Sequence, residues 1–196
     1  NGSRLQTNGK LVTGTWDDGK VTTLTSITTE DGDVVSGAPK TFAEGINAAV
    51  RTYLNYYDDI VGDYVDDYDL LDELEGDDED SYLDYNYSLI KLPGSEENII
   101  ATDFDIITFW YARFLKTESK EKAIARYKEL ATQLQAVSIS SAALPAKTKL
   151  TGTVNLPTGS DDSAETEFSL ANPGEKFKYF KVWLTLERNY DDMYIV

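Results

Sequence analysis

The side chains of this sequence that could carry chemistry are mainly carboxylates, because its 196 residues include no histidine and no cysteine. These two absences exclude thiol nucleophiles, disulfides, thiolate or imidazole metal ligands and a histidine general base. Fourteen of the 35 acids lie between Asp58 and Asp84. No Lys or Arg occurs from residue 52 to residue 90, so this segment carries most of the net charge of −17.

Two carboxylates are enough for a glycosidase-type hydrolase, in which one acts as the acid and the other as the base or nucleophile. With 35 acids, such pairs are available throughout the chain and spacing singles out none of them. The sequence contains no Gly-rich phosphate loop, dinucleotide-binding fingerprint, nucleophile elbow or EF-hand loop. We therefore keep a carboxylate-based hydrolase as an alternative, and we assign no catalytic residue, no cofactor and no metal ligand.

The local excess of acids indicates which partners the protein can have. Binding to nucleic acid or to an anionic membrane requires clustered Lys and Arg, so both are disfavoured. A basic protein surface is favoured instead. We expect a non-enzymatic interaction domain that docks a basic protein through its acidic segment. A second non-enzymatic alternative is an exported structural domain in which the acids only maintain solubility.

One long helix is predicted to present this acidic segment. Thr41 and Glu44 form a capping box at its start, in which the Thr hydroxyl accepts a hydrogen bond from the third helical N–H. From Phe42 to Leu71, apolar residues recur at steps of three and four, which is typical of one stripe on a helix. We expect a helix from Phe42 to about Leu74, with tyrosines and aliphatic side chains packed inward and acids facing solvent.

The acids on this predicted helix are spaced so that they repel one another. Asp59, Asp63 and Asp67 stand four residues apart, where like charges destabilise a helix by a few tenths of a kcal/mol per pair. A helix that breaks near Gly62 is an alternative, because an unbroken helix would be long for this domain. The candidate interaction surface combines acids with tyrosines on or beyond the helix, namely Asp59, Asp63, Asp66, Asp67, Tyr56, Tyr82 and Tyr85.

The first 38 residues are predicted to form a small β-meander that precedes the main domain. The dipeptides Asn8-Gly9, Asp18-Gly19 and Asp31-Gly32 are typical of tight hairpin turns, because they tolerate positive φ. Residues 11–16 and 21–28 between them are rich in Thr, Val and Leu, as strands are. We therefore divide the chain into a β-hairpin appendage, residues 1–38, and an α+β domain, residues 41–196.

Part of this meander carries a resemblance to a known family. Gly14-Thr15-Trp16-Asp17-Asp18-Gly19-Lys20 resembles the Gly-x-Trp-x-x-Gly-Lys centre of a MORN repeat, a short β-hairpin unit that occurs in tandem arrays. The resemblance spans residues 12–20, or about 15 residues if Asn8-Gly9-Lys10 is the tail of a preceding unit. Val12 stands where the repeat usually has an aromatic residue, and no array follows. The resemblance implies a scaffolding or membrane-associated module.

The remainder of the chain is predicted to supply a helix and an antiparallel sheet. Residues 119–137 form the clearest helical pattern, capped by Ser119. Residues 99–115 fit either a strand or a helix, with their β-branched and aromatic content favouring a strand. Further strands are predicted at 85–92, 149–156, 165–170, 177–187 and 193–196. The expected fold class is therefore α+β, an antiparallel sheet packed against two helices and preceded by the N-terminal meander.

Three further expectations come from composition and from the C-terminal pattern. With 41% apolar residues, the chain can build a hydrophobic core that needs no disulfides or metal ions to stabilise it. The absence of cysteine together with β segments rich in Thr, Asn and Ser favours an exported bacterial protein. Because the sequence ends on an apolar strand pattern, we expect the natural chain to continue past Val196.

Overall fold

The computed structural model describes residues 2–5, 10–17, 20–75, 83–103, 107–158, 161–189 and 193–196. Within these ranges the chain forms fourteen strands in three antiparallel sheets, together with three α-helices and one short 3-10 helix. The helices are α1 (Phe42–Tyr53), η1 (Asp58–Ile60), α2 (Tyr68–Glu75) and α3 (Lys120–Ala136). Among them, none is both long and apolar enough to cross a membrane.

The three sheets follow one another along the chain, apart from strand β9. The first has the order β1 (Gly2–Leu5), β2 (Leu11–Asp17), β3 (Lys20–Thr28) and β4 (Val34–Ser36). The second has the order β5 (Val61–Tyr64), β6 (Leu83–Ser88), β7 (Glu97–Asp103) and β8 (Ile107–Arg113). The third has the order β10 (Ser138–Ile139), β11 (Thr148–Thr151), β12 (Ala164–Leu170), β13 (Lys181–Arg188), β14 (Tyr194–Ile195) and β9 (Lys116–Thr117).

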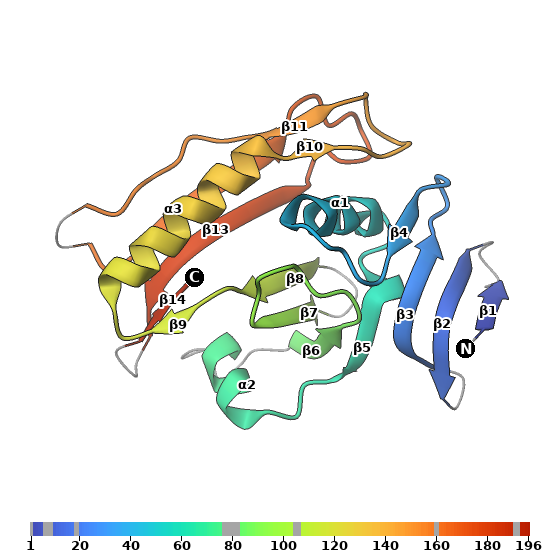
Figure 1. Ribbon diagram of the computed structural model, residues 1–196, viewed down its shortest axis with the longest axis horizontal. Coiled ribbons are helices and arrows are strands. Elements are labelled where there is room, and N and C mark those ends of the chain that lie inside the picture. The colour runs from blue at the N-terminus through green and yellow to red at the C-terminus, as the bar shows by residue number, and fades with distance from the viewer. Residues whose placement is uncertain are drawn as a thin grey trace.

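The predicted fold class is wrong, because this is a mostly β protein and not one sheet packed against two helices. Helix α3 packs on β13, as Figure 1 shows, and α1 lies between the sheets. The apolar segments after residue 84 do form strands, but they belong to two sheets. The N-terminal meander is confirmed, since β1 to β4 form one sheet in chain order.

The predicted long helix is also wrong, because it ends at Tyr53 after twelve residues. Tyr56 and Tyr57 adopt positive φ, which turns the chain out of the helical path. The turn inserts Ile60 into the core with no exposed surface. The strand β5 follows, and its Gly62 lies so close to β6 that a Cβ would stand 2.7 Å from the carbonyl oxygen of Tyr87. Burial of apolar side chains here outweighs a helical pattern that repelling aspartates already weaken.

Three local predictions are confirmed. The Thr41 hydroxyl accepts from the backbone N–H of Glu44 at 3.2 Å as predicted, although the Glu44 carboxylate accepts from the N–H of Lys40, one residue before the cap, and not from that of Thr41. Ser119 caps α3 in the same manner, by accepting from the N–H of Lys122. The segment 99–115 contributes most of β7 and all of β8, so its strand interpretation is the right one.

The N-terminal sheet shares a hydrophobic cluster with the rest of the chain. Val12, Ile27 and Val35 are buried against Tyr57 and Ile60. A larger cluster joins α1 and α3 to the third sheet, and a smaller one lies under α2. The central helix α1 therefore contacts all the main layers and can position residues between them.

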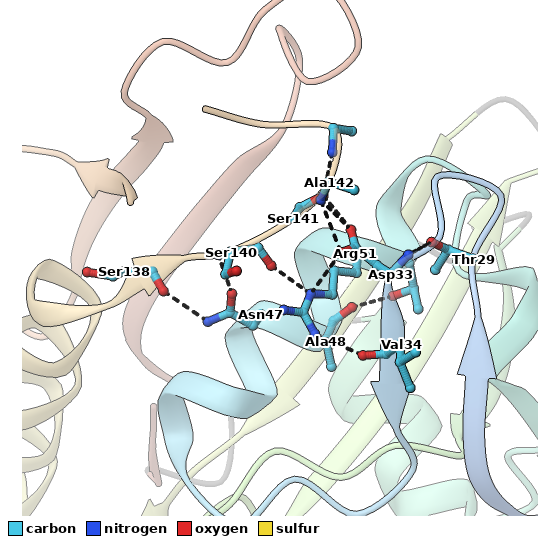
Figure 2. A network of polar contacts seen from close by, with 12 residues as sticks. Thr29, Asp33, Val34, Asn47, Ala48, Arg51, Ser138, Ser140, Ser141 and Ala142 are labelled. Carbon is cyan, nitrogen blue, oxygen red and sulfur yellow. Dashed lines mark hydrogen bonds and ion pairs between the residues drawn. The ribbon is translucent and has the colours of Figure 1, made fainter. Parts of the chain in front are cut away.

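A network of polar contacts fixes α1 in this place (Figure 2). Arg51 donates to the carbonyl oxygens of Ser140 at 2.7 Å and of Val34 at 2.9 Å. The Asn47 side chain donates to the carbonyl oxygen of Ser138 and accepts from the N–H of Ser140. These bonds tie α1 to β4 and to the segment after β10, so one face of the helix is held rigidly.

Candidate functional site

A cavity of about 670 Å³ lies between β8 and β13, with α1 along its side. Aromatic side chains make up much of its wall, among them Tyr53, Tyr57, Trp110, Phe114, Phe180 and Trp183. Residues 108–112 of β8 and residues 181–185 of β13 line it in unbroken runs. We call this cavity the interstrand slot. Figure 1 shows β8 and β13, the two strands that line it.

Helix α1 and the turn that follows it position aromatic rings along the slot. Tyr53 stacks on Phe177 at 5.9 Å between ring centroids and meets Phe180 edge-on at 5.0 Å. Tyr57 meets Trp110 edge-on at 5.9 Å. Pairs of this geometry are favoured by the aromatic quadrupole and add about 0.5–1.5 kcal/mol to the burial of each pair. The wall beside α1 is therefore preformed.

Both strands that border the slot are sheet edges there. Strand β8 is the last strand of its sheet, so within the described residues it pairs with β7 alone. Strand β13 pairs with β12 over residues 181–186, whereas β14 pairs only with Glu187 and Arg188. An edge strand presents a row of N–H and C=O groups that await partners. Two such rows thus face one cavity.

The register shows which groups of β13 face the slot. The N–H of Ala171 donates to the carbonyl oxygen of Lys149, so alternate residues of β12 bond to β11. The other residues of β12 bond to β13, so Phe168 bonds to Val182 and Thr166 bonds to Leu184. Backbone groups therefore point toward the slot from Lys181, Trp183 and Thr185.

The same alternation applies to β8. The N–H of Val65 donates to the carbonyl oxygen of Tyr85, which orients β6 toward β5 at that residue. Because the bonding direction alternates along each strand, the even-numbered residues of β6 bond to β7. The odd-numbered residues of β7 and β8 then bond to each other. The outward backbone groups of β8 are therefore those of Thr108, Trp110 and Ala112.

Strand β14 lies at one end of the slot, which Ile195 and Val196 line; Figure 1 shows β14 beside β13 and β9. It lies between β13 and β9, pairing antiparallel with both. Val196 continues it, since its carbonyl oxygen accepts from the N–H groups of Phe114 and Leu115. The slot therefore begins where β14 ends, and at that end it is one strand wide.

Tyr57, Tyr111 and Trp110 are among the polar side chains that line the slot. Burial and then the neighbouring Tyr53 raise the pKa of Tyr57 above its ordinary value. Burial and the nearby carboxylate of Glu73 raise the pKa of Tyr111. Both phenols therefore stay neutral near pH 7. The indole Nε1 of Trp110 is buried with no acceptor among the described residues, at a cost of about 1–3 kcal/mol.

A buried charge cluster supports β8 from the opposite face. Glu73 of α2 is 4% exposed and accepts from Arg113 at 2.6 Å and from Lys116 at 2.7 Å. Burial alone would lower the pKa of Arg113, but the hydrogen bond to Glu73 and nearby negative charges outweigh this and raise it. This cluster ties α2 to β8 and β9, and so positions one border of the slot.

The structure separates the residues that the sequence grouped as one interaction surface. Asp59 is 4% exposed at its side chain and forms an ion pair at 2.9 Å with Lys10, which is 2% exposed. Tyr85 lies in the small cluster under α2. Tyr56 is exposed and lines the rim of the slot. Tyr82 lies outside the described residues.

Three of the predicted acids do face solvent. Asp63 lies on β5, and Asp66 and Asp67 lie in the turn before α2. Asp67 has a structural role, because its carboxylate accepts from the N–H groups of Asp69 and Leu70 at the start of α2. The predicted single acidic helix face is therefore replaced by a shorter acidic turn, which also exposes Tyr64 and Tyr68.

Sequence reasoning missed the slot as a site. Trp110, Phe114 and Trp183 lie in segments that the sequence predicts to be strands, and their spacing carries no signal that two strand edges face each other. Comparison of the chain with protein-family models, curated proteins and solved structures gives no match. The resemblance of residues 12–20 to a MORN repeat therefore stays a prediction. Among the described residues, no three acids are grouped so that they could hold a metal ion.

Proposed function

We propose that this protein is a non-enzymatic binding module that holds a ligand with apolar groups in the interstrand slot. The observation that carries the proposal is the aromatic lining of a cavity of about 670 Å³. This volume lies within the range of about 300–1,000 Å³ that is usual for ligand sites, which combine apolar walls with a few polar groups. A two-carboxylate hydrolase is less well supported, because Glu187 is the single carboxylate among the described lining residues.

The proposal predicts binding of an uncharged apolar dye. We expect N-phenyl-1-naphthylamine to bind with a rise in fluorescence, since the slot shields it from water. An uncharged probe is needed because the net charge of −17 would repel anionic dyes. Replacing Ala49, which lines the slot from α1, with Phe should fill part of it and weaken dye binding by at least about tenfold.

A matched control lies on the same helix. Ala43 is exposed and does not line the slot, so A43F adds the same side chain outside it. We expect A43F to bind the dye as the unaltered protein does. Equal dye binding by A49F and A43F, with both variants folded by circular dichroism, would contradict the proposed site.

A second binding surface is favoured by the acidic turn around Asp63 and Asp66. Tyr64 and Tyr68 are 70% and 82% exposed beside these acids, and exposed aromatic residues are typical of recognition surfaces. We propose that this surface docks a basic protein. The acidic turn keeps the charge complementarity that the sequence predicts for this segment, although the predicted helix is absent.

The test uses a basic peptide of the sequence Lys-Arg-Lys-Arg-Lys with blocked ends. We expect the D63N/D66N variant to bind this peptide at least about threefold more weakly at low salt, because two exposed charges are removed. The control variant E165Q/E175Q removes the same charge from other exposed positions. A loss of equal size in both variants, measured by fluorescence anisotropy, would refute a specific role for the acidic turn.

A further inference from the structure

The backbone of the interstrand slot is arranged for one additional strand. Outward N–H and C=O groups come from Thr108, Trp110 and Ala112 on β8, as derived from the pairing register. On β13 they come from Lys181, Trp183 and Thr185. A small apolar molecule would leave these groups without partners, whereas a peptide strand carries the donors and acceptors that match them.

The position of β14 gives the direction of this strand. Glu187 pairs with Ile195, so a strand that continued the line of β14 would run antiparallel to β13 and pass Thr185, Trp183 and Lys181 in turn. On its other side, the register of β14 with β9 alone would place the second residue opposite Arg113. The carbonyl oxygen of Val196 accepts from both Phe114 and Leu115, so two residues oppose one there and the register shifts by one. The second and fourth residues therefore pass Ala112 and Trp110. The slot therefore has room along its edges for about five residues.

The two edges match such a strand residue by residue. In an antiparallel sheet, successive residues bond alternately to the two neighbouring strands. The first, third and fifth residues of the added strand would bond to Thr185, Trp183 and Lys181. The second and fourth residues would bond to Ala112 and Trp110. The outward groups derived independently for β8 and β13 are the ones that this alternation requires.

The same register sets the side chains of the occupant. Cross-strand neighbours point to the same face of a sheet. The second and fourth residues lie opposite Leu184 and Val182, which pack in the main core, so they would point toward α1 and α3. The first, third and fifth residues would share the face of Trp183, which is 48% exposed. The occupant thus needs apolar residues at every second position.

We infer that the interstrand slot binds an extended, alternately apolar segment of a partner protein as an added β-strand between β13 and β8. This inference rests on the proposed function and names its ligand class. The strand would continue the existing β14 interface and join the second and third sheets into one. Main-chain bonds would provide the affinity, and the aromatic wall would select the inward side chains.

The test compares two chains that carry five extra residues after Val196. One extension, Thr-Ile-Thr-Ile-Thr, places isoleucines at the two inward positions. The other, Ile-Thr-Thr-Thr-Ile, has the same composition but places them outward. Attachment gives the segment a high effective concentration at the slot. We expect the first chain to melt at least about 4 °C above the second, because only it fills the slot.

Two further readouts separate the possible outcomes. The first extension should also reduce binding of N-phenyl-1-naphthylamine by at least about tenfold, whereas the second should not. The free blocked peptide Thr-Ile-Thr-Ile-Thr at millimolar concentration should raise the melting temperature of the unextended chain, which the permuted peptide should not do.

Equal melting temperatures of the two extended chains would overturn the inference. If the dye still bound in that case, the proposed apolar site would stand and only the strand would be refuted. If the attached segment stabilised the chain but the free peptide had no effect, the added strand would not come from a partner protein.

Discussion

Replacing Asp59 with Asn is expected to destabilise the protein by about 3–5 kcal/mol, the usual effect of removing one partner from a buried ion pair. The side chains of Asp59 and Lys10 are 4% and 2% exposed, and their charged atoms lie 2.9 Å apart. Asn55 also donates to the same carboxylate oxygen at 3.0 Å. The substitution removes the negative charge that compensates a buried ammonium group.

Asp63 provides a matched control for this prediction. It lies four residues further along the chain and is exposed, so D63N should change the free energy of unfolding by no more than about 0.5 kcal/mol. Equilibrium unfolding in urea measures both variants. If D59N and D63N had equal effects, Asp59 would belong to the exposed acidic surface and not to the core.

A double substitution tests the same ion pair from the other side. Replacing Lys10 with Met and Asp59 with Leu removes both charges together and keeps similar volumes. Apolar replacements of this kind are often neutral or stabilising, so the double variant should recover most of the stability that D59N loses.

The Asp59 ion pair also explains why one part of the fold could not be predicted from the sequence. The steps of three and four from Phe42 to Leu71 describe a helix well, and the cap at Thr41 is where the pattern places it. Beyond the end of the helix, Asp59 turns inward to meet Lys10, a partner 49 positions away. Periodicity over a local window carries no information about such a contact.

Predictions from local chemistry fared better where the signal was itself local. The cap at Ser119 and the periodicity of α3 depend on neighbours a few residues apart, and all of α3 lies within the predicted range. Of the predicted hairpin dipeptides, Asp31-Gly32 lies in the connection between β3 and β4, whereas Asn8-Gly9 and Asp18-Gly19 lie outside the described residues. The strands after residue 145 were predicted with boundaries displaced by several residues at some ends. Their assignment to sheets depends on pairing between distant segments.

The candidate site was the least predictable feature. The aromatic residues of β8 and β13 were identified as strand residues, but the slot exists because β14 pairs with β13 only at Glu187 and Arg188. Where a pairing stops is set by the paths of the two strands in space. The acidic residues attracted attention because their charge is visible in the sequence, whereas an open strand edge is not.

Amide hydrogen exchange followed residue by residue tests whether β8 and β13 present unpaired backbone groups to one cavity. Amides held in strand pairs exchange slowly, because they must open before they react. The pairing register assigns the amides of Val182 and Leu184 to bonds with β12. It assigns the amides of Trp183 and Thr185 to the open edge.

The measurement should therefore alternate along β13 in the unextended chain, with Trp183 and Thr185 exchanging at least about tenfold faster than Val182 and Leu184. The Thr-Ile-Thr-Ile-Thr extension should abolish this difference by slowing the two fast amides. Uniformly slow exchange from residue 182 to residue 185 in the unextended chain would contradict the account, because the edge would already be paired.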